Sequence, residues 1–109
     1  MVSLGKEYIE VGRLNEALKR FNQASMGAPQ WAEPKHWAGY ANYLLKNYEG
    51  SILLYQEALK IDGGNPLLYK RLGLSYVAMN RPQDAKRAIQ KYLEMEPDAQ
   101  DKAEFERFL

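Results

Sequence analysis

Hydrophobic positions recur at helical spacing in short stretches, and turn residues separate one stretch from the next. One stretch opens at Pro66, because a missing N–H group costs nothing in the first turn of a helix. Asn80-Arg81-Pro82 interrupts it, and a second stretch runs to Glu96-Pro97. The apolar stripe of the first stretch is Tyr69, Leu72, Gly73 and Tyr76, and that of the second is Ala85, Ala88, Ile89, Tyr92 and Leu93. The pattern predicts a pair of helices.

The same arrangement precedes this pair twice. In the first unit Gly12 breaks the pattern, and the second stripe is Leu14, Ala17, Leu18, Phe21 and Ala24. In the middle unit Glu33-Pro34 opens the first helix, Lys46-Asn47 breaks it, and the turn 62–65 closes the pair. No segment alternates apolar and polar residues as a half-buried strand would. The sequence therefore predicts an all-α chain.

These units repeat with a period of 34 residues. Four sets of equivalent positions keep their character: glycines at 5, 39 and 73, small residues at 17, 51 and 85, bulky residues at 21, 55 and 89, and helix breakers at 29, 63 and 97. A glycine inside a helix costs about 0.5–1 kcal/mol relative to alanine, so the three glycines need a compensating reason. We expect close contact with the paired helix, where the glycines would meet Ala17, Ser51 and Ala85.

The repeated residues carry a resemblance to a known family. Leu72-Gly73, preceded by Tyr69 and followed by Tyr76, Ala85, Ile89 and Pro97, resembles the tetratricopeptide repeat. The resemblance implies a right-handed α-solenoid of three antiparallel helix pairs. We expect a single domain over 1–109, with repeats at about 1–31, 32–65 and 66–99. Residues 100–109 do not restart the pattern, and their apolar edge of Phe105, Phe108 and Leu109 predicts a capping helix.

The first helices of such repeats are expected to line a concave surface. Counting about 100° per residue from Gly73 places a second apolar sector at about +40° to +140°, outside the packing stripe. The candidate groove residues in this sector are Lys6, Ile9, His36, Tyr40, Tyr43, Lys70, Leu74 and Val77. Two interpretations stay open: some of these residues belong to the core between neighbouring helices, or they form a groove in which tyrosines contact a partner. We expect His36 to be a surface or groove residue.

Composition excludes several other functions. The 109 residues include 15 Lys and Arg against 14 Asp and Glu, and a net charge of +1 gives no field to gather nucleic acid. Without cysteine there is no thiolate zinc site, and a single histidine excludes a multi-histidine metal site. We expect neither a cofactor nor catalysis. No apolar run is long enough to insert into a membrane and no signal peptide is visible, which favours the cytoplasm.

The resemblance also allows one specific hypothesis to be tested. Some relatives hold the C-terminal carboxylate of heat-shock chaperones with Lys and Asn on the first helix, Asn on the next, and Lys and Arg on the third. The matching positions here hold Val2, Lys6, Trp37, Leu67 and Arg71, and only Arg71 agrees. We therefore do not expect a chaperone clamp. The sequence favours a non-catalytic module that binds a protein or peptide; the alternatives are self-association through the solenoid surface or an uncapped N-terminal face, and a regulatory array cut from a larger protein.

Overall fold

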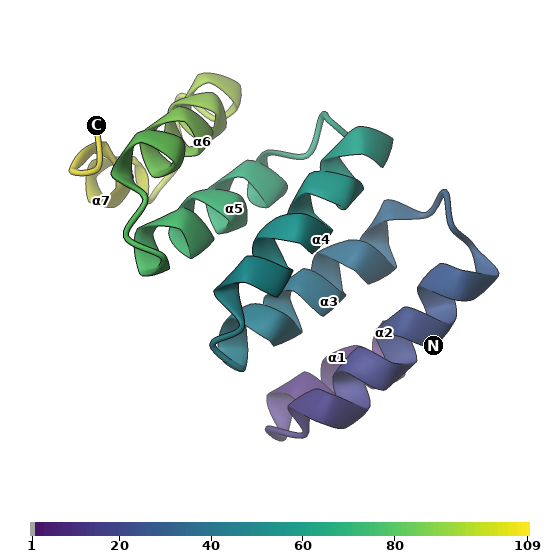
Figure 1. Ribbon diagram of the computed structural model, residues 1–109. Coiled ribbons are helices and arrows are strands. Elements are labelled where there is room, and N and C mark those ends of the chain that lie inside the picture. Colours follow the sequence, from purple (N-terminus) through teal and green to yellow (C-terminus); the bar gives the residue numbers. More distant parts are fainter. Residues whose placement is uncertain (1) are drawn as a thin grey trace.

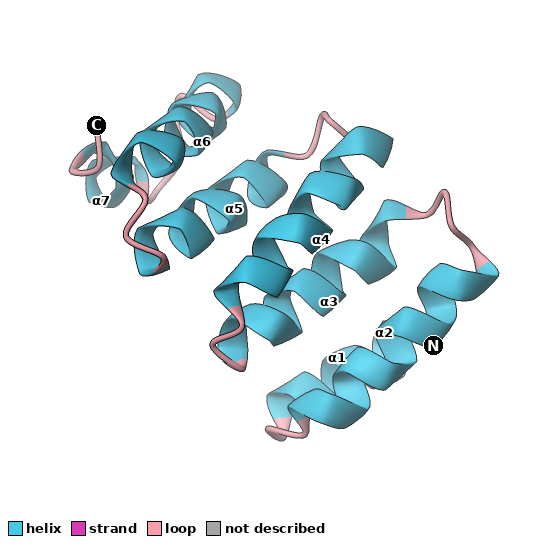
Figure 2. Ribbon diagram, in the orientation of Figure 1, coloured by secondary structure: helices cyan, strands magenta, loops and turns pink. Residues whose placement is uncertain are grey.

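The computed structural model describes residues 2–109, which form seven α-helices and no strand (Figures 1 and 2). The helices are α1 (Val2–Glu10), α2 (Leu14–Gly27), α3 (Ala32–Leu44), α4 (Tyr48–Ile61), α5 (Pro66–Ala78), α6 (Pro82–Met95) and α7 (Lys102–Glu106). They follow one another as three antiparallel pairs with the short α7 at the end (Figure 1). The predicted all-α solenoid of three helix pairs with a short C-terminal helix is confirmed.

The two helices of each pair lie on different faces of the molecule. Contacts between α1 and α3 and between α3 and α5 place these three helices side by side, while α2, α4 and α6 lie in front of them in Figure 1. Each second helix also contacts the first helix of the next pair, as α2 does α3 and α4 does α5. The α1, α3 and α5 face is therefore a continuous surface built from the same helix of every repeat.

The turn inside each pair uses one backbone conformation three times. Gly12, Lys46 and Asn80 are spaced by 34 residues and have φ values of 80°, 65° and 56°. The N–H of the next residue donates to the carbonyl five residues earlier at 2.8, 2.8 and 2.9 Å, which closes the preceding helix. Only the first repeat places glycine, the residue that adopts this conformation without strain, at this position.

The glycines do allow close contact within each pair, but their partners differ from those we expected. A Cβ added to Gly39 would lie 2.7 Å from Cε1 of Tyr55, and one on Gly73 would lie 2.7 Å from Cγ1 of Ile89. Gly5 meets the ring of Phe21 in the same way. The prediction that these glycines meet Ala17, Ser51 and Ala85 is therefore wrong. Long side chains lean over the preceding turn of their own helix, so the bulky residues cover the glycines.

The small residue of the middle repeat, Ser51, contacts the next pair. The hydroxyls of Ser51 and Ser75 lie 2.8 Å apart in the buried contact between α4 and α5. Small side chains at this position let neighbouring repeats approach. At the C-terminal end Phe105 is buried, with its ring 5.6 Å from that of Tyr92, so α7 covers the last repeat.

Candidate binding groove

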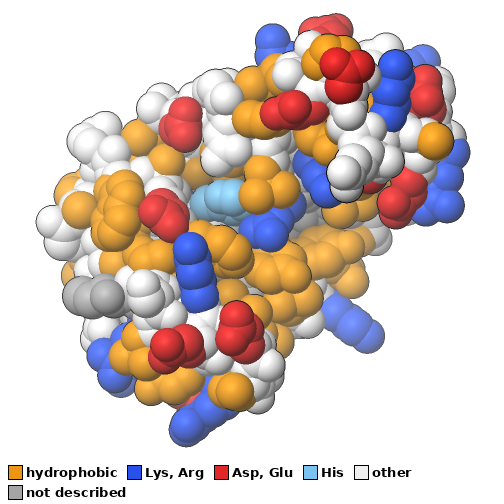
Figure 3. Space-filling model, turned by 180° about the vertical axis from the view of Figure 1, so that it is seen from behind, with side chains coloured by type: hydrophobic (Ala, Val, Ile, Leu, Met, Phe, Trp, Pro, Cys, Tyr) orange, Lys and Arg blue, Asp and Glu red, His pale blue; other side chains and the backbone are white. Residues whose placement is uncertain are grey.

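The predicted groove residues all lie on α1, α3 and α5. Six of them are half-buried, Val77 is exposed at the end of α5, and His36 is buried. Figure 3 views this face and shows the histidine colour in the middle of a hollowed surface, beside blue Lys or Arg side chains and broad apolar areas. Ile9 and Leu74 also pack against the buried core. These two residues are therefore partly core residues and partly candidate groove residues.

A hollow of about 190 Å³ lies at the centre of this face, between α3 and α5. Its lining residues are Tyr40, Tyr43, Tyr55, Leu67, Lys70, Arg71 and Leu74, four of which were predicted. A wider hollow of about 420 Å³ adjoins it toward α7 and shares Leu67 and Lys70. The largest hollow, about 520 Å³, lies on the other side, where Trp31, His36 and Trp37 contribute to its wall. The central hollow and the one toward α7 therefore adjoin, whereas the third hollow shares no lining residue with either.

Arg71 carries a positive charge into the central hollow. Its Nη1 donates to Nε2 of His36 at 3.1 Å, and its Cζ lies 4.1 Å from the ring centre of Tyr40 and 5.0 Å from that of Trp37. Burial lowers the pKa of Arg71, although arginine keeps its proton at any working pH. No carboxylate among residues 2–109 lies within ion-pair distance of this guanidinium.

His36 lies beneath the groove surface. Its side chain is 6% exposed, stacks on Trp37 with ring centres 5.6 Å apart, and meets the edge of Tyr55 at 6.1 Å. His36 was expected to be a surface or groove residue; it lines a hollow of the α1, α3 and α5 face, but it is buried and not at the surface. Burial, followed by the positive charges of Arg71 and Lys6, lowers the pKa of His36 to about 4. The ring is neutral at pH 7, so Nε2 accepts the hydrogen bond from Arg71 and the proton is on Nδ1.

The two predicted lysines are engaged with acidic residues. Lys6 Nζ lies 3.3 Å from Oε1 of Glu33 and 4.6 Å from the ring centre of Trp37. Lys70 Nζ lies 2.5 Å from Oδ2 of Asp101, in the segment that leads to α7. Lys70 therefore joins the groove to the C-terminal end of the molecule. Of the groove cations Lys6, Lys70 and Arg71, only Arg71 has no acidic partner among the residues described.

Tyr55 forms part of the floor of the central hollow. The residue is 0% exposed, and its hydroxyl has no hydrogen-bond partner within the described chain. Burial raises the pKa of Tyr55, and the positive charge of Arg71 opposes this effect. The hydroxyl thus stays protonated at neutral pH and is able to donate a hydrogen bond.

A family model described as tetratricopeptide repeat matches residues 2–66, and another of the same description matches residues 42–105. The chain belongs to the tetratricopeptide repeat (TPR) family. Proteins with this fold are typically non-catalytic modules for protein interaction. No curated protein matches the chain.

Solved TPR structures share this fold. The first TPR domain of Spaghetti (RPAP3), bound to the HSP90 peptide SRMEEVD, is similar with a TM-score of 0.93 and 19% identity over 98% of this chain and 86% of that one. The TPR2B domain of yeast Sti1 in its pHsp70 complex has a TM-score of 0.87 and 18% identity over 95% and 86%. MamA has a TM-score of 0.84 and 26% identity, covering 88% of this chain but only 56% of MamA.

Four residues of this candidate TPR groove were missing from the predicted set: Trp37, Tyr55, Leu67 and Arg71. Trp37 and Arg71 occupy equivalent positions in consecutive repeats, at about 160° from the glycine and so just beyond the sector that we counted. Their long side chains reach into the groove from there. Tyr55 occupies the bulky position that is Phe21 in the first repeat and Ile89 in the third. Its hydroxyl, on an otherwise apolar position, was the signal in the sequence.

The described part of this TPR chain contains no group of three or more His, Cys, Asp or Glu side chains arranged to hold a metal ion. Within residues 2–109, none of the helices has the length and apolar character needed to cross a membrane.

Proposed function

We propose that the α1, α3 and α5 face binds an extended segment of a protein partner without catalysis. The observation that carries this proposal is the central hollow of this face, which is lined by Tyr40, Tyr43 and Leu74 and adjoins the hollow toward α7. Similar domains of Spaghetti and Sti1 were solved with chaperone peptides, which supports peptide binding as the kind of function. A chaperone C-terminus is not the ligand that we propose, because Trp37 and Leu67 stand where relatives place polar clamp residues.

Recognition in this proposal depends on shape and burial. Tyrosine contributes a large contact area with few rotatable bonds, so little side-chain entropy is lost when a partner binds. The repeats hold the three helices in place before binding, which limits the cost of ordering the site. A groove of this length gives an affinity of micromolar order for a single peptide.

The test uses two leucines that differ in position. Leu74 lines the central hollow, whereas Leu53 on α4 is 60% exposed and lies outside it. Peptides selected from a random linear library against the wild-type chain should lose about 1–3 kcal/mol of binding free energy with Leu74→Ala. With Leu53→Ala their affinity should stay unchanged. Equal losses for both variants would contradict the proposal, as would a library that yields no binder.

Alanine variants of Leu74 and Tyr40 decide whether these two residues belong to the groove or to the core. If Leu74 and Tyr40 mainly contact a partner, their alanine variants should unfold near the wild-type midpoint. If they are core residues, Tyr40→Ala should cost about 3–5 kcal/mol of folding free energy, as large aromatic truncations do. Urea unfolding of both variants, measured beside the binding assay, separates the two.

Self-association is the second candidate, and one observation favours it. Val11 and Met26, on the first helix pair and its turn, are large apolar residues that are 69% and 83% exposed. Sedimentation velocity over a dilution series tests it. A mass that rises with concentration supports association, and a monomer throughout contradicts it.

A further inference from the structure

We infer that the Tyr55 hydroxyl and the Arg71 guanidinium form a carboxylate subsite at the floor of the central hollow. This subsite binds a Glu or Asp side chain in the middle of the bound segment. The inference rests on the proposed function, since the acidic residue reaches the floor only if a peptide occupies the groove. It adds the partner's chemistry to that function: one negative charge flanked by apolar residues.

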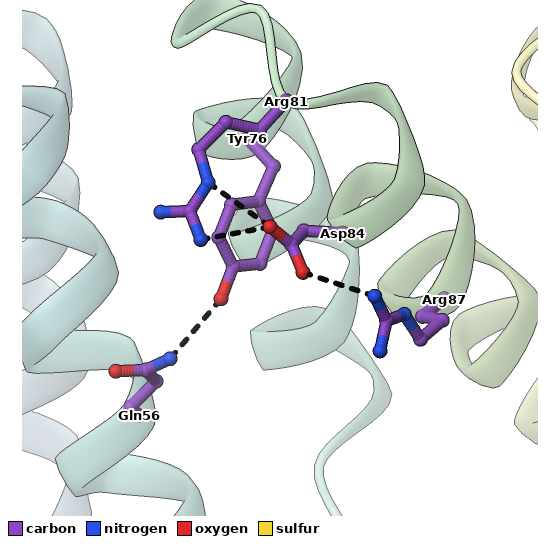
Figure 4. Close-up of polar contacts among 5 residues, drawn as sticks. All are labelled: Gln56, Tyr76, Arg81, Asp84 and Arg87. Atoms are coloured by element: carbon purple, nitrogen blue, oxygen red, sulfur yellow. Dashed lines mark hydrogen bonds and ion pairs between the residues drawn. The ribbon is translucent and has the colours of Figure 1, made fainter.

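The first observation is the unpaired hydroxyl of Tyr55. A buried polar group without a partner is costly, and native structures keep few of them. Tyr76 shows the ordinary solution, because its hydroxyl accepts a hydrogen bond from Nε2 of Gln56 at 3.1 Å (Figure 4). The Tyr55 hydroxyl has no such partner in the described chain, and Tyr55 is one of the residues that line the central hollow. A ligand that accepts its hydrogen bond removes this cost.

The ring of Tyr55 packs closely against its neighbours, which restrains the direction of its hydroxyl. Gly39 packs against one edge so closely that even a methyl group there would lie 2.7 Å from Cε1. The ring of His36 meets Tyr55 nearly at right angles, at 72°. The donor is therefore restrained before a ligand arrives, which favours binding.

The second observation is the unpaired charge of Arg71. Elsewhere in the protein Asp84 lies between Arg81 and Arg87, with N···O distances of 2.8 and 3.4 Å (Figure 4). Arg71 instead has a neutral histidine and two aromatic rings as neighbours. His36 takes one of the five N–H donors of the guanidinium and leaves others for a ligand.

A carboxylate satisfies both groups together. It accepts several hydrogen bonds on two oxygens, and bonds from a charged guanidinium are among the strongest that proteins form. The engagement of Lys6 with Glu33 and of Lys70 with Asp101 leaves a single positive charge for the ligand. Because one hollow adjoins the central one toward α7 and another lies toward α1, we expect the peptide chain to extend past the subsite in both directions. This arrangement favours an internal side chain over a chain terminus.

The experiment uses three blocked peptides and NMR titration of the isotope-labelled chain at low salt. The first is acetyl-Ser-Leu-Leu-Glu-Leu-Leu-Ser-amide, the second has Gln in place of Glu, and the third is the Gln peptide with a free C-terminus. Wild-type protein should bind the Glu peptide at least 5-fold more tightly than either Gln peptide. Arg71→Gln should abolish this preference, and Tyr55→Phe should reduce it at least 3-fold.

Two variants control for folding. Tyr55→Phe keeps the ring and creates the residue that Phe21 already provides at the equivalent position, so its melting temperature should not fall. Tyr76→Phe makes the same chemical change at a hydroxyl that has a partner, and it should leave the Glu preference as in the wild type.

The possible failures are distinguishable. If the Glu and Gln peptides bind equally, or if Tyr55→Phe keeps the full preference, the subsite is wrong and the groove function stands. If the free C-terminus restores the affinity of the Gln peptide to that of the Glu peptide, the subsite reads a chain end, which overturns our assignment of a side chain. If no peptide binds, the proposed function is contradicted together with the subsite.

Discussion

Two polar clusters in this protein use the same residue types with opposite results. In the Tyr76 cluster (Gln56, Tyr76, Arg81, Asp84 and Arg87) the tyrosine hydroxyl has a partner and the two arginines share one carboxylate (Figure 4). In the groove-floor cluster (His36, Tyr55 and Arg71) the tyrosine hydroxyl has no partner in the described chain, and the arginine has only a neutral one. Residue type therefore does not distinguish structural from functional positions here. What differs is whether the fold itself supplies the partners.

The groove-floor cluster should accordingly be the place where stability is given up for binding. A buried charge and an unmade hydrogen bond both raise the free energy of the folded state. Polar groups that have partners, such as those around Asp84, should each stabilise the folded state by a small amount. The predictions below test this contrast, beginning with the largest effect.

Acid should weaken the groove-floor cluster through His36. Its pKa is lowered to about 4 in the folded protein, so between pH 6.5 and 4 the unfolded chain binds the proton and the folded chain does not. Stability therefore falls as the pH falls through this range, and the difference in pKa corresponds to about 3 kcal/mol. Urea unfolding from pH 7 to pH 4 measures the loss. His36→Gln stays neutral and should show a flatter profile; parallel profiles would show that the pKa of His36 is the same in the folded and the unfolded chain.

A methyl group at Gly39 should disturb the ring of Tyr55. Gly39→Ala places Cβ 2.7 Å from that ring, and overpacking of this kind costs about 1–3 kcal/mol. Gly27→Ala is the matched control, because nothing lies within 4 Å of a Cβ built at that position. Thermal unfolding of both variants measures the difference. A Gly39→Ala protein as stable as the control would mean that the ring is free to move.

Removal of the two hydroxyls should affect stability in opposite ways. Tyr76→Phe deletes the partner of Gln56 and should lower the unfolding free energy by about 0.5–1.5 kcal/mol. Tyr55→Phe removes a buried group with no partner in the described chain, so its unfolding free energy should be unchanged or higher. Chemical denaturation at one pH suffices to compare them. A loss for Tyr55→Phe equal to that of Tyr76→Phe would remove the contrast between the clusters.

The sequence predicted the repeats, the all-α fold and four lining residues of the central hollow because these depend on periodicity. Apolar stripes and the 34-residue spacing are properties of the local chain. Counting angles along a helix also locates a face. It locates the Cβ atom of each residue, however, and not the end of a long side chain, so Arg71 and Trp37 fell outside the counted sector.

Partners across helices could not be predicted in this way. Lys70 was expected at the groove rim, but its charge meets Asp101, thirty-one positions further along the chain. His36 was expected at the surface or in the groove, and its burial against Tyr55 and Arg71 by the neighbouring helices was not predicted. The glycines were paired with small residues, although the direction of the bulky side chains decides the contact. Each of these contacts depends on how two helices pack against each other. The pattern of residues in one sequence does not contain that information.

The smallest expected effect concerns Arg87 in the Tyr76 cluster. Its side chain is 76% exposed and its Nη2 lies 3.4 Å from Oδ1 of Asp84, three residues earlier on the same helix. Water screens such a pair, and Asp84 keeps the closer Arg81 at 2.8 Å. Arg87→Ala should therefore change the unfolding free energy by less than about 0.5 kcal/mol. Denaturation at low and at high salt measures it, and the binding of the Glu peptide should stay at the wild-type level. A loss well above this size, or a weakened peptide, would mean that the two clusters are coupled through α5 and α6 and that the contrast between them is not local.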